Sequence, residues 1–310
     1  MQESMWIAIL TATVTAGTPL LYAALGEVLA ERAGVMNLGL EGMMLVGAMT
    51  GFSVTVRTGN PWLGLLAAMG AAGVLALVHA FLTVGLRANQ VVSGLALTIF
   101  GTGLSGYLGK PMVGIPAKAT FKTWALPWLG DIPVIGPVLF HHDALVYLTY
   151  LLVPAIWFFL YHTRPGMNLR AVGENPAAAD AVGIDVSATR YAYVVVGGLL
   201  SGAAGAYLSL AYAPSWLENM TAGRGWIAVA LVIFAMWDPV RAMLGAYLFG
   251  GVDALTFRLQ ALGVLIPSFF LKMLPYVFTI VVLIVSTRET LLRKSAAPGA
   301  LGLTYDREGR

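Results

Sequence analysis

The sequence of 310 residues contains no cysteine and few charged residues. Without cysteine the chain has no disulfide framework, no thiolate chemistry and no cysteine for lipid attachment. Asp, Glu, Lys and Arg make up 11% of the residues, and hydrophobic types make up 58%. Soluble domains carry about 25% charged residues, so this composition excludes two soluble domains and predicts a membrane protein.

Motifs for catalysis are absent as well. The chain has no Gly-x-x-x-x-Gly-Lys-Ser/Thr phosphate loop, no His-Glu-x-x-His zinc motif and nothing that resembles a nucleophile elbow. His141 and His142 precede Asp143 beside a helix start, where a solvated pair is commoner than a metal site. We therefore expect no catalytic residue, no metal and no cofactor. The basic residues are spread thinly between apolar runs and form no basic face, which excludes a nucleic-acid partner.

Long stretches with almost no charge predict transmembrane helices, because a helix needs about 20 mainly apolar residues to cross the hydrocarbon core. Six such stretches are Ser4–Gly26, Thr58–Leu86, Ala88–Gly109, Ala144–Thr163, Tyr191–Leu217 and Phe269–Thr287. Gly42–Val56 is shorter, and spans the membrane if its helix starts near Leu38. The apolar run Gly225–Phe257 is broken at Asp238-Pro239, which predicts two helices that meet at a turn. The expected fold is an all-α polytopic membrane protein, a bundle of about nine (8–10) transmembrane helices.

The placement of basic residues predicts the orientation of this bundle. Eleven Lys and Arg residues fall on the side of the C-terminus and seven on the other side, which places the C-terminus in the cytoplasm and, with nine spans, the N-terminus outside. The first five residues carry no Lys or Arg, and no cleavage site stands out after them, so the first helix is expected to be retained. We divide the chain into a transmembrane domain, residues 1–290, and a polar cytoplasmic tail, residues 291–310.

Two segments outside the spans are long enough to carry function. The external one, residues 110–143, is rich in proline and contains Trp124 and Trp128, which favours turns and short helices at the membrane interface. It is either a lid or packing loop, or a docking surface for an external partner. The second segment, residues 163–190, lies on the cytoplasmic side.

The cytoplasmic segment contains the pattern of a short independent helix. Asn175 is suited to cap it, Pro176 suits the first helical position, alanines follow, and Gly183 suits a left-handed stop. A helix of about two turns is marginal alone, so its presence on a cytoplasmic loop indicates a surface for a partner. The alternative is a helix that only packs beneath the bundle.

This segment also carries a resemblance. Arg170–Ile184 (RAVGENPAAADAVGI) resembles the cytoplasmic coupling segment of the ABC-importer permeases of the ribose, branched-chain amino acid and nucleoside systems. Later and earlier blocks are similar to the nucleoside-type (simple-sugar-type) subgroup, in the same order: Glu31–Met44, Asn89–Leu97, Gly223–Ala228 and Leu274–Thr279. One block departs from the pattern, because Ala235–Pro239 (AMWDP) lacks the usual glycine and basic residue before the tryptophan.

The resemblance implies a permease subunit in the inner membrane of a bacterial or archaeal cell, with no ATPase motif of its own. Its implied partners are an ABC ATPase subunit, a second related permease, an external substrate-binding lipoprotein and membrane lipid. Nucleosides are the implied substrate, with simple sugars or branched-chain amino acids as alternatives. The implied ATPase-coupling residues are Glu174, Asn175, Pro176, Ala179, Asp180 and Gly183, with Ala179 on a docking face of small residues.

Polar residues near the helix ends are the candidates for a substrate path, because ionisable groups within a membrane tend to face a cavity or each other. The candidates are Asn37, Glu41, Asn89 and Gln90. Asn37 and Glu41 would share a face of one helix, and Arg32 would neutralise a carboxylate, so an ion-paired elbow is the alternative. Capping a helix is the alternative for Asn89 and Gln90. Asp253 is expected to pair with Arg258.

A different class of protein, the ion-coupled secondary transporter, is also a polytopic bundle. Such a transporter usually needs a carboxylate at the membrane midplane or an interrupted helix to couple an ion. The long spans of this chain are almost free of charge. The sequence therefore favours the permease over the secondary transporter.

Overall fold

A computed structural model describes residues 5–261, single positions between 270 and 284, and residues 297–306. The described chain is mainly helical, and its two strands contain two residues each. Five of the described helices are long and apolar enough to cross a membrane: Met5–Arg32, Pro61–Gly85, Gln90–Met112, Ala144–His162 and Val186–Tyr212. The all-α polytopic membrane fold is confirmed. The predicted span Phe269–Thr287 lies largely outside the described residues.

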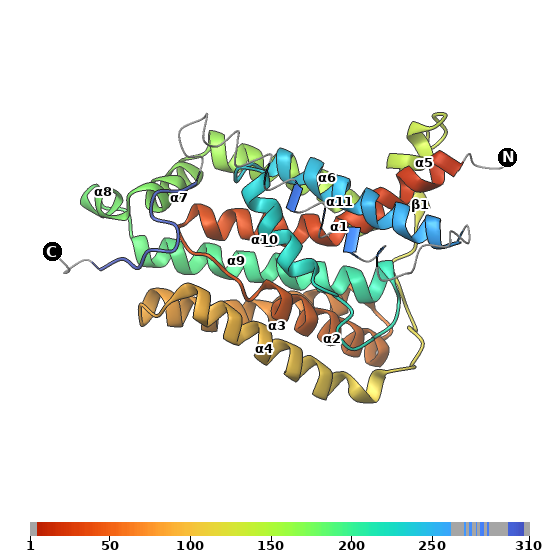
Figure 1. Cartoon of the computed structure of the whole chain (residues 1–310), viewed down its shortest axis with the longest axis horizontal. Coiled ribbons are helices and arrows are strands. Elements are labelled where there is room, and N and C mark those ends of the chain that lie inside the picture. Colours follow the sequence, from red (N-terminus) through yellow and green to blue (C-terminus); the bar gives the residue numbers. More distant parts are fainter. Residues whose placement is uncertain are drawn as a thin grey trace.

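Two long helices form the centre of the bundle. α1 (Met5–Arg32) and α9 (Val186–Tyr207) pack along each other. α2 (Leu40–Thr58) and α3 (Pro61–Ala80) cover one side of this pair, and α4 (Gln90–Gly109) lies outside them. The other side is covered by α6 (Ala144–His162), α10 (Arg224–Phe234) and α11 (Pro239–Ala261) (Figure 1). Turns of π-helix, η1 (Phe81–Gly85) and η3 (Leu208–Tyr212), extend α3 and α9.

Small elements occupy the two ends of the bundle. The end that the sequence predicts to be external carries η2 (Lys110–Met112), α5 (Ile135–Leu139) and an antiparallel ribbon of β1 (Trp124–Ala125) and β2 (His141–His142). The expected turns and short helices of the external segment are present, but the ribbon was not expected. The opposite end carries α7 (Arg164–Glu174), α8 (Pro176–Ala181) and the C-terminus (Figure 1).

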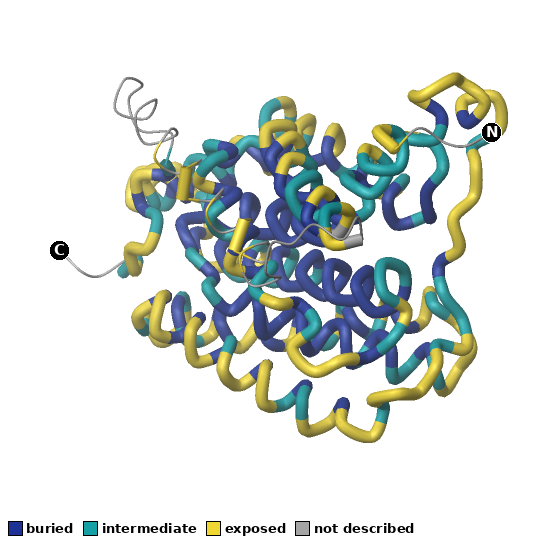
Figure 2. Tube along the Cα trace, turned by 45° about the vertical axis from the view of Figure 1, so that its right-hand side comes forward, coloured by how far each residue is buried: buried dark blue, intermediate teal, exposed yellow. Residues whose placement is uncertain are grey.

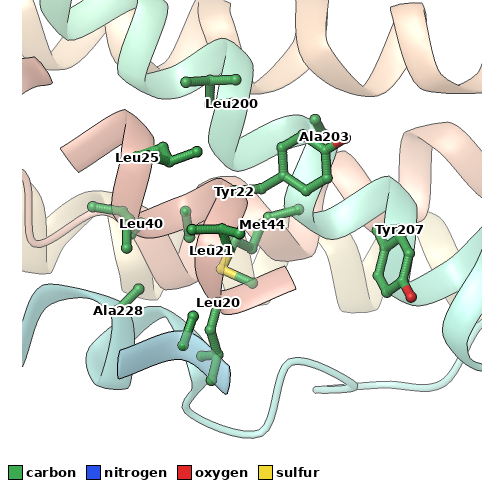
Figure 3. Close-up of a cluster of buried hydrophobic side chains, with 14 of the residues drawn as sticks. Leu20, Leu21, Tyr22, Leu25, Leu40, Met44, Leu200, Ala203, Tyr207 and Ala228 are labelled. Atoms are coloured by element: carbon green, nitrogen blue, oxygen red, sulfur yellow. The ribbon is translucent and has the colours of Figure 1, made fainter. Parts of the chain in front are cut away.

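Burial follows this arrangement, with buried residues along the middle of the bundle and exposed residues around it (Figure 2). Side chains of α1, α2 and α9 meet in the centre, among them Leu21, Leu25, Met44 and Tyr207 (Figure 3). Large apolar side chains are also exposed on the outer helices: Leu66, Val74, Phe81, Val92, Ile99, Phe100, Leu151, Phe158, Leu244 and Leu248. An apolar exterior around a close-packed interior is the pattern of a protein whose solvent is lipid.

Glycine lets the central helices approach backbone to backbone. A Cβ atom on Gly47 of α2 would lie 2.8 Å from the Cα of Gly202 on α9. A Cβ atom on Gly26 of α1 would lie 2.7 Å from the carbonyl oxygen of Gly197 on α9. These glycines therefore serve helix packing.

Helix ends differ from the predicted ones at two places. α1 continues past Gly26 to Arg32, and α9 starts at Val186 rather than Tyr191, so the predicted coupling loop ends five residues early and Arg190 is helical. The run of residues 225–257 forms two helices, as predicted, because Asp238 ends the turn and its Oδ1 accepts the N–H groups of Val240 and Arg241 at the start of α11. The predicted spans are too short at these ends, because a charged residue is expected to end a membrane-spanning helix. In the structure the helices continue past Glu27, Glu31 and Arg190, which are buried.

Two helices begin inside the bundle instead of at its ends. Residues 33–39 turn back from the end of α1 into the bundle, where α2 begins (Figure 1). Residues 213–223 lead from the external end of α9 to the first turn of α10, which contacts the first turn of α2. We call residues 33–39 and 213–223 the two re-entrant segments.

Candidate functional site

The cytoplasmic segment folds as its local pattern predicts. The Thr163 hydroxyl accepts the Gly166 N–H at 3.2 Å and starts α7. Asn175 separates α7 from α8, and its Oδ1 accepts the Ala178 N–H at 3.0 Å. Pro176 occupies the first turn of α8, and Gly183 is left-handed with φ of +87°. The predicted cap, first proline and glycine stop are confirmed, because all three depend on neighbours within the same few residues.

The orientation of α8 differs from the expected one. Ala179 is 2% exposed and packs in a small apolar cluster with Val172 of α7 and Val186 of α9. The expectation that Ala179 lies on an exposed docking face is therefore wrong. The exposed small residues are Ala177, Ala178 and Ala181, followed by Val182. A run of alanines has no amphipathic pattern, so the sequence could not distinguish the buried alanine from its neighbours.

The other residues of the predicted coupling set lie at the surface or half-buried. Glu174, Asn175 and Gly183 are exposed, and Pro176 and Asp180 are half-buried. Asp180 and Glu174 both contact residues 298–306, which we call the strap. The Tyr305 hydroxyl donates to Asp180 Oδ2 at 3.0 Å, and the Gly299 N–H donates to Glu174 Oε2 at 3.3 Å. No pattern in the sequence indicated that part of the expected polar tail packs against α7 and α8.

The first re-entrant segment gathers two of the four candidate path residues. The Asn37 backbone N–H donates to Glu27 Oε1 at 2.8 Å, and Asn37 Oδ1 accepts the Gly39 N–H at 3.0 Å. Gln90 is buried, and its Oε1 accepts the Met36 N–H at 2.7 Å. Asn89 is exposed and caps α4 through the Val92 N–H. Asn37 and Gln90 therefore bind backbone groups of this segment. Asn89 caps a helix, which is the alternative to a place in the substrate path.

Glu41 joins the two re-entrant segments. Its carboxylate accepts three hydrogen bonds, from the Thr221 hydroxyl at 2.5 Å and from the N–H groups of Gly223 at 2.8 Å and Gly225 at 2.6 Å. These amides belong to the start of α10, where free N–H groups and the helix dipole favour an anion. The expected shared face of Asn37 and Glu41 is wrong, because α2 begins at Leu40 and Asn37 is not helical.

The expected ion pairs also differ. Arg32 donates to the backbone carbonyls of Met236 and Trp237, at 3.2–3.4 Å, rather than to a carboxylate. The Trp237 indole N–H donates to Glu31 Oε2 at 2.5 Å. Asp253 pairs with Arg224 at 3.2 Å, and not with the expected Arg258. The observed partners lie far along the chain, in the turn between α10 and α11 and at the start of α10, rather than one turn away in sequence.

Trp237 and Arg190 are two residues whose roles sequence reasoning missed. Trp237 has positive φ of 56° and belongs to the block that departs from the expected family pattern. Arg190 is 1% exposed and donates to Ala33 O at 3.1 Å and Leu303 O at 3.0 Å. In the sequence, Arg190 is a lone arginine at a predicted helix boundary. It contributed only to the predicted orientation of the bundle.

The described residues contain no group of three or more His, Asp or Glu side chains able to hold a metal ion. In the external ribbon, His142 Nε2 donates to Val138 O at 2.8 Å. Burial lowers the pKa of His142 and raises the pKa of Asp143, whose carboxylate caps α6. The arrangement of polar groups thus positions backbone segments within the described chain, and α8 presents an exposed face at one end of the bundle.

Comparison with known proteins agrees with this geometry. Residues 9–287 match the family described as branched-chain amino acid transport system, permease component. The putative glucose ABC transporter permease protein TsgC13 of Haloferax volcanii is 46% identical, over 97% of this chain and 98% of its own. The same organism has the glucose ABC transporter permease protein TsgB13, which is 29% identical over 77% of this chain and 67% of its own.

Two further relatives carry nucleoside names. The guanosine ABC transporter permease protein NupQ of Bacillus subtilis is 36% identical, over 96% of each chain. The nucleoside ABC transporter permease protein NupC of Lactococcus lactis is 38% identical, over 93% of each chain. No solved structure matches this chain.

Proposed function

The chain belongs to the permease family of the branched-chain amino acid transport systems and is a multi-pass membrane subunit of an ABC transporter, and from this premise we propose that it forms half of an import path for nucleosides. The single observation that carries the substrate class is the similarity to NupQ and NupC along almost the whole chain. The proposed location is the inner membrane of a bacterial or archaeal cell, with about nine spans in all.

ATP hydrolysis is assigned to a partner. The chain has no phosphate loop, so an ABC ATPase subunit must supply the chemistry. α8 is proposed as the helix that enters a groove of that ATPase, and it is supported by its exposed alanines and its capped ends. Asn175, Pro176 and Gly183 would shape α8, and Glu174 and Asp180 would hold it, while Ala179 would anchor it from its buried face.

Two more partners complete the proposed importer. A second, related permease is supported by TsgC13 and TsgB13, two permease proteins of one organism that both match this chain. The large apolar side chains exposed on the outer helices would face lipid and this second subunit. An external substrate-binding lipoprotein would deliver the solute to the end that carries α5 and the ribbon.

The translocation path is proposed to follow the junction of the re-entrant segments, where α2 and α10 begin. Asn37, Glu41 and Gln90 would shape this path as positioning residues, since their polar atoms already bind the backbone of the segments. Asn89 would lie at its cytoplasmic rim.

Uptake of labelled nucleosides tests the proposed substrate. A strain that lacks this chain should lose ATP-dependent uptake of purine or pyrimidine nucleosides, and the intact gene should restore it. Unchanged uptake of every nucleoside in the deletion strain would remove this substrate class. Purified chain alone should neither bind nor hydrolyse ATP, and stoichiometric ATP binding would contradict the assignment of hydrolysis to a partner.

A simple sugar is the second candidate substrate, and a specific observation favours it. TsgC13, at 46% identity, carries a glucose name. Nucleosides and sugars share a ring with several hydroxyl groups, so one path can be permissive to both while the external protein selects. The same deletion strain distinguishes them, because loss of labelled glucose uptake with normal nucleoside uptake would select the sugar.

A further inference from the structure

The strap, residues 298–306, crosses the cytoplasmic end of the bundle and is fixed by its backbone at two points. The Ala300 N–H donates to Gly173 O at the end of α7 at 2.9 Å. Two residues later, the Gly302 N–H donates to Gly34 O in the first re-entrant segment at 3.2 Å. The strap therefore joins the helix that leads into α8 to the segment that leads into α2.

Side chains strengthen both attachments. The Tyr305 hydroxyl bonds Asp180 of α8, and the Tyr305 ring packs against the apolar cluster that contains Ala179. The buried guanidinium of Arg190 donates hydrogen bonds to Ala33 O in the re-entrant segment and to Leu303 O in the strap. A charged donor gives stronger hydrogen bonds than a neutral one, so Arg190 clamps the strap onto the re-entrant segment.

The far end of the strap has a third attachment. Asp306 pairs with Arg87 at 2.5 Å, at the turn between η1 and α4. Arg87 lies one turn before the helix whose Gln90 holds Met36 of the same re-entrant segment. Between Tyr305, Asp180 and Arg87 lies a cleft of about 430 Å³, so α8 is not packed directly against η1 and reaches it through the strap.

The strap has internal bonds that make it compact. The Leu301 N–H donates to Pro298 O at 3.0 Å, and the Leu303 N–H donates to Ala300 O at 3.1 Å. Two consecutive turns of this kind shorten the segment and oppose stretching. A compact segment bonded at both ends transmits a displacement, whereas a flexible tether would absorb it.

We propose that the strap is a positioning element of the coupling mechanism, which carries a movement of α8 directly to the first re-entrant segment and hence to the start of α2. This inference rests on the proposed function, since it takes α8 as the helix that meets the ATPase. It adds a second route beside the covalent one, in which movement of α8 passes through α7 to α6 and through Val186 to α9. The strap reaches the re-entrant segment, which neither α6 nor α9 continues into.

The test uses the complete importer in vesicles, with solute uptake and ATP hydrolysis measured on the same sample. Deletion of residues 298–310 should leave the ATPase bound, because the exposed face of α8 is unchanged. The amount of solute imported per ATP should fall about tenfold, as expected for a coupling element. Tyr305→Phe keeps the ring in its apolar cluster, removes the bond to Asp180, and should lower the same ratio about threefold.

A charge exchange provides the matched control. Arg87→Asp and Asp306→Arg should each lower solute imported per ATP, and the double variant should restore it, which a loss through general damage would not do. An unchanged ratio in the deletion and in Tyr305→Phe would overturn the proposal, and so would loss of ATPase binding in Tyr305→Phe. Where the deletion fails to insert, Tyr305→Phe and the charge exchange decide alone.

Failure of the proposed function gives a different result. A wild-type complex without any ATP-dependent uptake would refute the proposed import function. The amount of solute imported per ATP could then not be compared between variants. A wild-type complex that imports solute, with strap variants that import the same amount per ATP, would refute the strap alone.

Discussion

At the scale of single residues, three charged side chains of this chain bind backbone groups rather than each other. Glu41 accepts two backbone amides, and Arg32 and Arg190 donate to backbone carbonyls. Each of these charges meets a turn or the first turn of a helix, where N–H and C=O groups lack the partners a helix interior would give them. Glu41 and Arg190 therefore stabilise the two re-entrant segments, and Arg32 stabilises the turn at Met236 and Trp237.

Replacing Glu41 tests this role. Glu41→Gln keeps the size of the side chain but removes its charge and one acceptor oxygen, so the N–H groups at the start of α10 lose part of their bonding. We expect a loss of about 1–3 kcal/mol in the free energy of unfolding and a lower melting temperature of the purified protein in detergent.

Glu218→Gln is the matched control, because Glu218 lies in the second re-entrant segment but is exposed. Its melting temperature should stay within one degree or so of wild type, since surface substitutions change stability by about 0.5 kcal/mol or less. Equal melting temperatures for Glu41→Gln and wild type would contradict the bridging role of Glu41.

At the scale of elements, one face of α8 is packed against the protein and the other face is exposed. Two neighbouring alanines, Ala179 and Ala178, lie on the packed face and on the exposed face. Ala178→Arg places a charge on the open face, where nothing in the described chain is displaced. We expect normal membrane insertion, a normal melting temperature, and loss of ATPase association in a pull-down with the partner ATPase.

Ala179→Arg is the paired variant on the closed face. A large charged side chain among Val172, Val186 and Tyr305 should cost about 1–3 kcal/mol through overpacking alone and should lower the melting temperature. ATPase association by Ala178→Arg at the wild-type level, at matched expression, would show that the open face of α8 is not the docking surface.

Gly183 ends the same element in a left-handed conformation. Nothing lies within 4 Å of a Cβ atom placed there, so Gly183→Val introduces backbone strain without a clash. The left-handed region costs a β-branched residue about 1–2 kcal/mol, which should fray the end of α8. Transport at roughly half the wild-type rate or less, with normal amounts of protein, is the expected result; full transport would show that the glycine is dispensable.

The external ribbon should be sensitive to acid. Burial lowers the pKa of His142 below its ordinary 6.5, so the folded state holds His142 neutral. A lowered pKa in the folded state gives stability that is present above pH 6.5 and is lost as the pH falls below it. Hydrogen exchange of residues 124–147 should therefore speed up between pH 7 and pH 5.

The variant His142→Gln isolates this effect, because glutamine does not titrate. The neighbouring Asp143 also responds to pH, because burial raises its pKa and its contribution to stability has the opposite sign. The contribution of Asp143 remains in the variant, so the difference between wild type and His142→Gln reports His142. An identical acid response in both proteins would exclude His142 as its source.

At the scale of the whole molecule, the two ends of the bundle should face opposite compartments. The chain has no cysteine, so single cysteines at Ala178 and at Trp128, both exposed, report sidedness without background. A membrane-impermeant thiol reagent should label Trp128→Cys on intact cells and Ala178→Cys only after the cytoplasmic side is opened. Labelling of Ala178→Cys from outside would invert the bundle.

Features that depend on neighbouring residues could be predicted from the sequence, whereas features that depend on residues far along the chain could not. The Asn175 cap, the Pro176 start and the Gly183 stop depend on adjacent residues, and the sequence predicts all three. Hydrophobic length likewise predicts five spans. The partners of Arg32, Asp253 and Arg190 lie far along the chain and are brought close only by the tertiary fold, which no local pattern predicts. Glu27 and Glu31 led to a different error. Their charge predicts that the first helix ends before them, whereas α1 continues through both residues.

The glycine contacts among α1, α2 and α9 limit how the protein can change shape. Where Gly26 meets Gly197 and Gly47 meets Gly202, backbone touches backbone and no side chain lies between that could change its rotamer. A contact of this kind offers no alternative packing, so the three helices should rock as one rigid body. In the proposed importer, alternating access would then occur by tilting this body against the elements around it, α10 and the second permease, rather than by repacking among α1, α2 and α9.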